Sequence, residues 1–400
     1  MGLYIRLRKV VLSIFICVFI ISVAEADPSI SIDNGLRIVS GDDNNSFLLG
    51  GYLLVDTIPV DSHTSRLPRF DLFNAWLFMQ GKVNKRFTYK IQFSLDDYSS
   101  RKLRDAFVGF EVAPGHIVQI GHFDVPTFAE HLSALSFTPL AGRSMVDSLA
   151  PGRDVGAMLN GMLLNKRAYY ALGIFNGNGI DANGEDNASK DMAFRLTGRV
   201  FGSSDISGFR LYPDFTFNAG KQDRDSLLLR NEVGTRFFSI PDLDSGLRYR
   251  SSMSLYAMSG AISLRADYLQ NAYRFTGQDA FESVSGASFL ISYYLTGESD
   301  RYQRGVFRKV KANDTWQIVG RFSLLSISDG FLKQSALSVG VADIRDARNA
   351  HALSLGLNWL PVSNAKFNLS WIQSRFGVLS GSELGDVENV FMARTTLQYF

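Results

Sequence analysis

Cysteine is nearly absent from this sequence, which contains one in 400 residues. That residue, Cys17, lies in an N-terminal stretch with the composition of an export signal, so the exported chain contains none once the signal is removed. Such a chain has no disulfide bonds and no thiol chemistry. A secreted β-sandwich of this length could well use disulfides, whereas a barrel in an outer membrane does not need them. The lack of cysteine therefore favours a barrel.

Long apolar runs and an excess of one charge are also lacking. After residue 26 there is no run of about 18 apolar residues, the length that a membrane-spanning helix needs. Residues 1–26 contain three of the 41 basic residues and one of the 39 acidic residues, so the rest of the chain carries no net charge. Proteins that bind nucleic acids need a basic excess to neutralise phosphates. We therefore expect no nucleic-acid partner.

The N-terminus has the three parts of a secretory signal peptide. Arg6, Arg8 and Lys9 form a basic head, residues 10–23 are apolar, and the A-E-A sequence at 24–26 fits a cleavage site. Export places the mature protein outside the cytoplasm. We predict three parts of the chain, namely a signal peptide at 1–26, a polar periplasmic lead-in at 27–46 and one outer-membrane β-barrel domain at 47–400.

Apolar and polar residues alternate through most of the remaining chain. In RFTYKIQFSLD (86–96) every odd position is apolar and every even position is polar or charged. Successive side chains of a strand point to opposite faces, so this segment predicts a strand with one apolar and one polar face. About 18 stretches of this kind occur, many of them separated by turn signals, and no long window has helical periodicity. The pattern predicts an all-β fold.

The charged residues of the six clearest strands all lie on the polar faces. A lysine or arginine that faces lipid costs about 2–4 kcal/mol at mid-bilayer, whereas it costs little in an aqueous lumen. The acidic residues on these faces are Asp96, Asp191, Glu232 and Asp267. We predict that the polar faces line a lumen with a basic wall formed by Arg86, Lys90, Arg195, Arg199, Arg230, Arg236, Arg248, Arg250, Arg265 and Arg321.

The large number of predicted strands indicates that the sheet closes into a barrel. Many antiparallel strands without edge-protecting prolines favour a closed barrel, because closure leaves no unpaired strand edge. The chain also ends in TTLQYF, and a terminal aromatic residue such as Phe400 is typical of the last strand of outer-membrane barrels, where it is an assembly signal. We therefore predict a closed antiparallel transmembrane β-barrel, surrounded by the lipid of a Gram-negative outer membrane.

Two segments carry a family resemblance. Residues 104–161 contain a D-A-aromatic strand, a G-x-F-x-x-P turn, a loop with a glutamate, an R-S pair and P-x-R-D-x-G, and YYALGIFNGNG follows at 169–179. Residues 292–307, SYYLTGESDRYQRGVF, contain an aromatic-LTGE-x-x-x-Tyr element. These segments resemble the phosphate-selective porins O and P of Gram-negative outer membranes, and the similarity extends from about residue 50 to 400.

The resemblance implies a trimer of 16-stranded barrels in which the third loop folds into the lumen and forms the constriction. The residues agree about that loop, because 124–152 has no clean alternation and exceeds the usual limit of about 12–15 residues for structureless connections. The strand count stays open between 16 and 18. Between residues 258 and 314 the sequence contains one very short connection and one long one, so the alternation permits either number.

The third loop supplies the candidate constriction residues Glu130, His131, Arg143, Ser144 and Arg153. Arginine suits an anion filter because a guanidinium binds carboxylate or phosphate oxygens bidentately. The alternative is that Arg143 and Arg153 hold the loop in place by ion pairs, and Glu130 is expected to anchor the loop rather than to touch solute. The chain has no lysine between Lys102 and Lys166, whereas phosphate-selective relatives use lysines around the constriction.

We find no motif for catalysis, for a metal or for another cofactor. His122, Asp124, Glu130 and His131 have no metal-site spacing, and the glycine of DANGEDNAS (181–189) is at the wrong position for a calcium loop. The sequence therefore predicts a porin, not an enzyme, that gives small hydrophilic and preferably anionic solutes passive diffusion. The alternatives are a general, weakly selective porin and a barrel that serves mainly as a surface scaffold or adhesin.

Overall fold

The computed structural model describes much of the chain from residue 28 to residue 399. The described ranges are 28–32, 35–58, 69–96, 102–177, 189–202, 207–222, 225–243, 246–275, 277, 279–338, 347–378 and 386–399. The predicted signal peptide at 1–26 and the predicted assembly signal at Phe400 lie outside these ranges.

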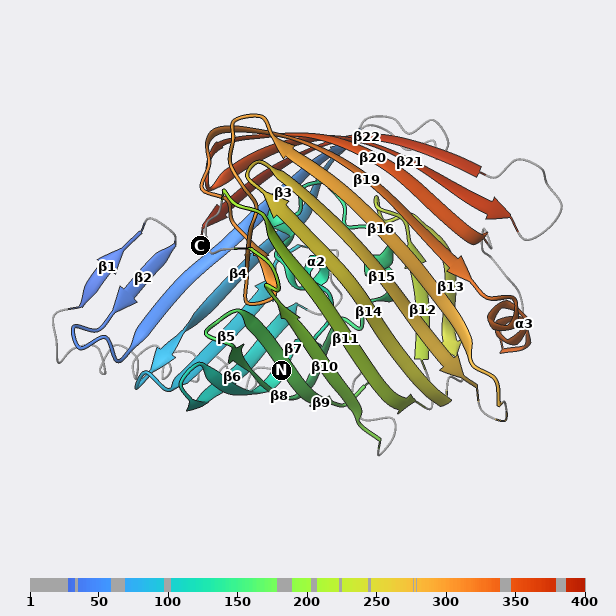
Figure 1. The fold of residues 1–400 in the computed structure, drawn as a ribbon, viewed down its shortest axis with the longest axis horizontal. Coiled ribbons are helices and arrows are strands. Elements are labelled where there is room, and N and C mark those ends of the chain that lie inside the picture. The colour runs from blue at the N-terminus through green and yellow to red at the C-terminus, as the bar shows by residue number, and fades with distance from the viewer. Residues whose placement is uncertain are drawn as a thin grey trace, which may run out of the picture.

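Sixteen antiparallel strands form a closed barrel wall (Figure 1). The last strand pairs with the first, with Arg394 opposite Asp56, so the sheet closes on itself. The wall strands are β3 (Ser46–Ile58), β4 (Arg69–Val83), β5 (Phe87–Ser94), β6 (Leu103–Ala113), β7 (His116–Asp124), β8 (Arg153–Leu163), β9 (Ala168–Phe175), β10 (Asp191–Gly198), β11 (Arg210–Gln222), β14 (Gly246–Ser259), β15 (Ile262–Arg274), β16 (Glu282–Tyr294), β19 (Asn313–Ile327), β20 (Ala347–Val362), β21 (Ala365–Val378) and β22 (Asp386–Tyr399). The predicted closed barrel of 16 strands is confirmed, and the alternative of 18 is wrong.

The other strands are not wall strands, and one hairpin among them falls between residues 258 and 314, where the sequence allowed a higher count. Hairpin β12–β13 (Asp225–Arg230 and Arg236–Leu243) and hairpin β17–β18 (Arg301–Gln303 and Val306–Arg308) form separate two-stranded sheets. Strands β1 (Ser29–Ser31) and β2 (Leu36–Val39) extend the wall sheet instead, because β2 pairs with the first residues of β3, where β22 has already ended. Local alternation alone cannot distinguish such short strands from wall strands.

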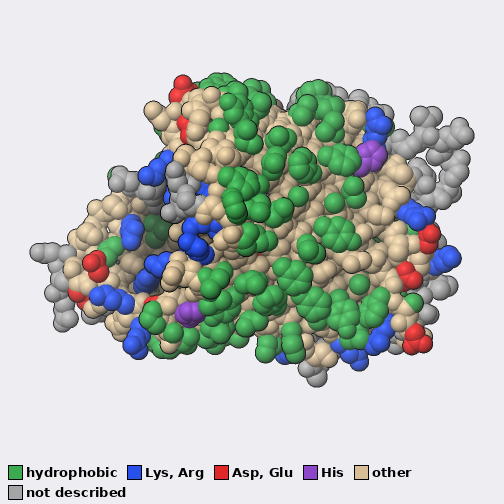
Figure 2. Space-filling model, in the orientation of Figure 1, with side chains coloured by type: hydrophobic (Ala, Val, Ile, Leu, Met, Phe, Trp, Pro, Cys, Tyr) green, Lys and Arg blue, Asp and Glu red, His purple; other side chains and the backbone are tan. Residues whose placement is uncertain are grey.

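Inward and outward side chains follow the predicted alternation. In β16 the outward Phe289, Ile291 and Tyr293 are exposed on the outer face, whereas the inward Ser288 and Ser292 are buried. Figure 2 shows apolar side chains spread over the outside of the wall and most charged side chains towards its two ends. This outer surface matches the lipid-facing band of an outer-membrane barrel.

Aromatic residues mark the two rims of the band. Near one end of the wall, Trp359 stacks on Trp316 with 5.9 Å between the ring centroids, and on Phe367 with 5.3 Å. At the opposite end Tyr249 lies 5.9 Å from Phe217 and 5.3 Å from Phe281. Aromatic girdles at both membrane–water interfaces are typical of outer-membrane barrels. Among the described residues, no helix has the length and apolar character needed to cross a membrane.

The face assignment of β5 predicts opposite outcomes for two neighbouring substitutions. Ile91 lies on the lipid-facing side, whereas Gln92 lines a cavity in the lumen. We expect Ile91→Arg to destabilise the barrel by about 2–4 kcal/mol, because it places a charge in lipid, and Gln92→Arg to be tolerated. Folding yields in liposomes measure the difference. Equal yields for the two variants would contradict the assignment of the faces.

Candidate functional site

The third loop lies inside the barrel. It connects the end of β7 at Asp124 to the start of β8 at Arg153, and it contains helix α2 (Ala129–Leu132) and two short 3-10 helices, η1 (Leu135–Phe137) and η2 (Met145–Leu149). Figure 1 shows α2 within the ring of wall strands.

Hydrogen bonds from the opposite wall fix the loop in this position. Lys366 of β21 donates to the carbonyl oxygens of Ser136 at 3.0 Å and Thr138 at 2.6 Å. Asn358 of β20 donates to the carbonyl of Pro139 at 2.7 Å, and Arg394 of β22 donates to a further loop carbonyl, that of Ala141. A loop anchored to strands that are remote from its own crosses the lumen. The predicted inward folding of the third loop is confirmed.

A buried ion-pair network joins the loop to the wall. Arg321 of β19 lies 3.1 Å from Glu130 of the third loop and 2.6 Å from Glu232 of the β12–β13 connection, and it is 2% exposed. Glu130 also accepts hydrogen bonds from the backbone nitrogen of Ser144 at 3.1 Å and from its hydroxyl at 2.5 Å. Glu130 and Ser144 therefore anchor the loop, and Arg321 is a buried tether instead of the wall charge that the sequence suggested.

Three further predicted wall arginines also form buried ion pairs. Carboxylates from other wall strands or from the connection between β16 and β19 lie within 2.5–2.7 Å of each guanidinium. The pairs are Arg195 with Asp214, Arg248 with Asp191 and Arg265 with Asp300. A similar pair that was not predicted joins Arg394 to Asp56. Because each positive charge is matched at contact distance, these arginines add little net field to the lumen.

The remaining predicted wall residues occupy several different places. Arg86 lies in the exposed turn between β4 and β5, and Arg199 follows the end of β10. Arg230 and Arg236 lie on the β12–β13 hairpin, whose alternation reflects one apolar face packed on the interior. These four are therefore not on the wall strands, which corrects the predicted basic wall. Arg250 lies on β14 and does not line the cavity described below.

Apolar side chains fill one side of the lumen. Leu229 and Phe237 of the β12–β13 hairpin pack with Val146 of η2 and with Phe331 of helix α3 (Asp329–Ser338). Inward residues of β15, β16, β19, β20 and β21, such as Leu325, complete this cluster. The packed cluster leaves open space towards the other side of the barrel.

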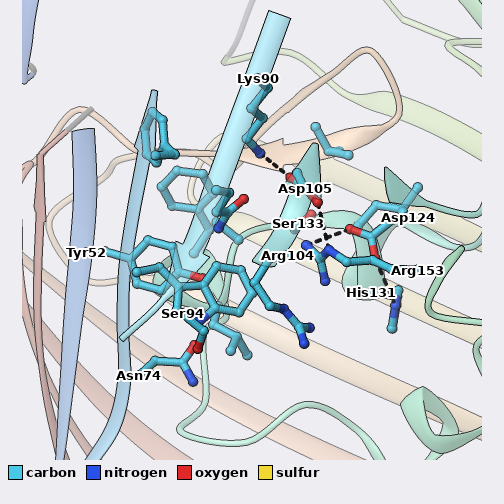
Figure 3. Close-up of a pocket in the computed structure, with 18 of the residues that line it drawn as sticks. Tyr52, Asn74, Lys90, Ser94, Arg104, Asp105, Asp124, His131, Ser133 and Arg153 are labelled. Atoms are coloured by element: carbon cyan, nitrogen blue, oxygen red, sulfur yellow. Dashed lines mark hydrogen bonds and ion pairs between the residues drawn. The ribbon is translucent and has the colours of Figure 1, made fainter. Parts of the chain in front are cut away.

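A cavity of about 550 Å³, called the lumen cavity here, occupies that side. Residues of β3 to β8, the third loop and strand β18 line it (Figure 3). Its charged lining contains more basic than acidic residues. The basic ones are Lys90, Arg104, Arg143, Arg153 and Arg308, the acidic ones are Asp96, Asp105 and Asp124, and His131 lies among them.

Many of these charges form one chain of alternating sign, part of which is drawn in Figure 3. Its successive contacts are Lys90–Asp105 at 2.5 Å, Asp105–Arg153 at 2.7 Å, Arg153–Asp124 at 3.0 Å, Asp124–His131 at 3.7 Å, His131–Asp147 at 2.8 Å and Asp147–Arg143 at 3.7 Å. The chain connects the wall to the third loop. Three of the five predicted constriction residues, His131, Arg143 and Arg153, thus line the lumen cavity, whereas Glu130 and Ser144 do not.

Arg143 both fixes the third loop and lines the lumen cavity. Its guanidinium donates hydrogen bonds of 2.8 Å to the carbonyl oxygens of His131 and Ser133, which fixes the turn of the third loop. It also lines the lumen cavity. A positive charge held in this way needs no rearrangement when an anion approaches.

Two basic lining residues, Arg104 and Arg308, were not predicted. Arg104 enters the lumen because the pairing of β5 with β6 shifts register between Ile91 and Phe93, a bulge that turns both Arg104 and Asp105 inward. Arg308 lies on the β17–β18 hairpin, within the connection between β16 and β19. Arg104 occupies a position that simple alternation would point outward, and Arg308 does not lie on a wall strand.

The titration of His131 is expected to make the anion preference depend on pH. Burial lowers the pKa of His131, but the negative charge of Asp147, its hydrogen bond to the ring and the nearby carboxylate of Asp124 raise it by more, so the net shift is upward from about 6.5. The stabilising contribution of the protonated ring is complete below the ordinary value and is lost as the pH rises through the raised one. We expect anion preference to fall over the same rise, because the cavity loses one positive charge.

Zero-current potentials across a salt gradient, recorded from about pH 5 to about pH 9, measure this change. His131→Asn removes the titrating group and should give a flat profile over this range. A wild-type profile that is equally flat would contradict the prediction.

The part of the chain that the structure describes contains no group of three or more His, Cys, Asp or Glu residues placed to hold a metal ion. Asp105 and Asp124 of the lumen cavity form ion pairs with Lys90 and Arg153 instead. The arrangement can attract and orient a diffusing anion.

Comparison with known proteins identifies the family. The profile of the family described as "Phosphate-selective porin O and P" matches residues 59–399. Porin O of Pseudomonas aeruginosa is 22% identical over an alignment of 424 positions, which covers 94% of this chain and 92% of that protein.

Solved structures of similar fold are outer-membrane proteins. OmpT of Vibrio cholerae in its trimer form has a TM-score of 0.55 at 13% identity, over 89% of this chain and 100% of that chain. The anion-selective porin from Comamonas acidovorans has a TM-score of 0.53 at 10% identity, with the same coverage. At these identities the likeness shows the fold, and the profile match shows the family. The chain therefore belongs to the phosphate-selective porin O and P family and is an outer-membrane β-barrel porin.

Proposed function

We propose that the protein lets small hydrophilic anions diffuse passively across the outer membrane into the periplasm. The observation that carries this proposal is the charge of the lumen cavity, where five basic residues face three acidic ones. Fixed charges around a narrow aqueous path attract ions of opposite sign and repel ions of the same sign. No reaction is needed, so we also propose that the protein is not an enzyme.

The relatives support an anion as the solute. The family name refers to phosphate, and the porin from Comamonas acidovorans is described as anion-selective. The lumen cavity of this chain differs from a lysine-rich phosphate site. Among the described residues that line it, Lys90 is the only lysine and the other basic residues are arginines. We therefore propose small anions as a class and not phosphate alone.

Assembly and export are also proposed by analogy. OmpT of Vibrio cholerae is described in a trimer form, and we propose a homotrimer for this chain as well. We further propose that cleavage after Ala26 gives a mature protein that begins at Asp27, and that Phe400 acts as the assembly signal. Outer-membrane fractions that retain Met1 would contradict the proposed cleavage.

Planar bilayers test the proposed selectivity. The purified protein is inserted into a bilayer between two potassium chloride solutions of unequal concentration, and the zero-current potential is recorded. We expect a sign that shows chloride to be more permeant than potassium. A potential near zero, or one that favours potassium, would reject anion preference.

A weakly selective general porin is the second candidate. The alternating chain from Lys90 to Arg143 favours it, because most charges of that chain are paired with opposite charges. The same recording distinguishes the two functions, since a general porin conducts but gives a potential close to zero.

A further inference from the structure

Aromatic side chains lie next to the arginines of the lumen cavity. Tyr52 of β3 and Trp76 and Phe78 of β4 line it on the wall side. The rings of Tyr52 and Trp76 have centroids 5.2 Å apart. Phe137 of the third loop and Phe307 of β18 also line the cavity. Aromatic rings offer inorganic ions no hydrogen bonds, whereas sites for small organic molecules are lined mainly by apolar and aromatic side chains with a few placed polar groups.

Two of the lining guanidinium groups are held close to Trp76. Arg104 lies 5.2 Å and Arg153 lies 5.4 Å from the centroid of its ring. These distances fit cation–π contacts, which hold each guanidinium beside an aromatic ring while leaving its edge available to an anion. Arg153 is further fixed by Asp105 at 2.7 Å and Asp124 at 3.0 Å.

Two buried hydrogen-bond donors in this region have no acceptor among the described residues. The indole nitrogen of Trp76 is buried and has no acceptor within the described part of the chain, and the same holds for Nε of Arg143. A buried donor without an acceptor costs free energy, so such donors commonly serve a ligand or a water molecule. In this cavity the spare donors lie beside arginines, which is the arrangement that an acceptor-rich anion requires.

We propose that Tyr52, Trp76, Arg104 and Arg153, called the aromatic–arginine site, bind an aromatic carboxylate during its passage. The ring of the solute lies against the aromatic side chains, and its carboxylate accepts hydrogen bonds from the guanidinium groups. The cavity volume of about 550 Å³ lies within the range of roughly 300–1,000 Å³ that is usual for small-molecule sites. The inference rests on the proposed anion-conducting function and names a class of solute for it.

Blocking of chloride current by added acids tests the site. Benzoate, cyclohexanecarboxylate and acetate carry the same charge and differ in the group attached to it. We expect benzoate to reduce the single-channel chloride conductance at concentrations about tenfold lower than cyclohexanecarboxylate or acetate, because only benzoate combines a flat ring with a carboxylate.

The four tryptophans provide a matched pair of variants. Trp76 lines the lumen cavity, whereas Trp316 lies on the outer face of the wall, where it stacks on Trp359. We expect Trp76→Leu to weaken the benzoate effect about tenfold, Trp76→Phe to retain most of it, and Trp316→Leu to leave it unchanged. Benzoate block that survives Trp76→Leu would show that Trp76 only holds the arginines, and it would overturn the proposal.

The wild type alone gives a decisive comparison if Trp76→Leu does not fold. Equal effects of benzoate and the other two acids on wild-type current would overturn the aromatic–arginine site. The zero-current potential in potassium chloride separates this failure from failure of the proposed function. Anion preference without benzoate block rejects the site alone, whereas absence of anion preference rejects the function on which it rests.

Discussion

Arg321→Met is expected to destabilise the barrel by about 3–5 kcal/mol and to loosen the third loop. Arg321 lies between two buried carboxylates, those of Glu130 and Glu232, and it also donates to the carbonyl of Gly142 at 3.0 Å. Methionine fills similar space but leaves both carboxylates without their counter-charge, and an uncompensated buried charge is costly. Denaturant unfolding in detergent micelles measures the loss, and a freed loop should make single-channel conductance larger and less uniform.

Two controls separate lost charge from lost packing. Arg86→Met removes a similar side chain from an exposed turn and should leave the unfolding transition unchanged. A triple variant with Arg321→Met, Glu130→Gln and Glu232→Gln removes the arginine together with both negative charges, so it should recover much of the stability. If Arg321→Met unfolds at the wild-type denaturant concentration, Arg321 does not tether the loop.

The prediction of the wall from sequence succeeded because the face on which a side chain lies depends only on its odd or even position along the strand. Residues 87–94 form β5, and the odd positions face lipid as the alternation indicated. A charge that faces lipid destabilises the barrel, so the outward positions of each strand are apolar and can be recognised in the sequence. The inward folding of the third loop was implied by the family resemblance. The residues agreed with it, because 124–152 is a long connection without alternation, which needs a function or a place to pack.

The alternation of apolar and polar residues could not show what each inward arginine contacts. Arg195 and Arg248 are inward, as their positions in the pattern required, yet their charges are matched by Asp214 and Asp191. Such pairs depend on the register between strands and on loops that enter from outside the strand. Arg394 and Asp56, which close the barrel at opposite ends of the chain, are the extreme case of a contact without local signal.

Arg104 was missed for a different physical reason. A one-residue bulge reverses parity locally, so a residue that the alternation assigns to lipid turns into the lumen. The hairpin strands produced the opposite error, since Arg230 and Arg236 alternate with apolar neighbours that pack inside the barrel and not against lipid. An apolar face looks the same in sequence whether protein or lipid covers it.

Selectivity should depend on the arginines of the lumen cavity more than on basic residues elsewhere. We expect Arg104→Gln and Arg143→Gln, and to a smaller extent Arg153→Gln, to lower the chloride-over-potassium permeability ratio more than Arg199→Gln does. The first three arginines line the cavity, whereas Arg199 lies beyond the end of β10 and does not. Zero-current potentials in planar bilayers measure the ratio for each variant.

The expected size follows from the dielectric environment. At 4 Å two unit charges interact by about 1 kcal/mol in water and by about 4 kcal/mol at an effective dielectric constant near 20. A change of about 1.4 kcal/mol corresponds to a factor of ten, so one neutralised cavity arginine can lower the preference by up to about tenfold. Smaller effects are expected for Arg153, because two carboxylates already compensate its charge at 2.7 and 3.0 Å.

Salt provides an independent check on the same variants. The screening length falls from about 10 Å at 0.1 M to about 3 Å at 1 M, so differences that arise from fixed charges should shrink at high salt. Differences that persist at 1 M would instead indicate that a substitution had changed the shape of the path. Charges that line the narrow path must act more strongly on a passing ion than a charge outside it. If Arg199→Gln moves the potential at low salt while Arg104→Gln and Arg143→Gln leave it unchanged, the lumen cavity is therefore not the filter.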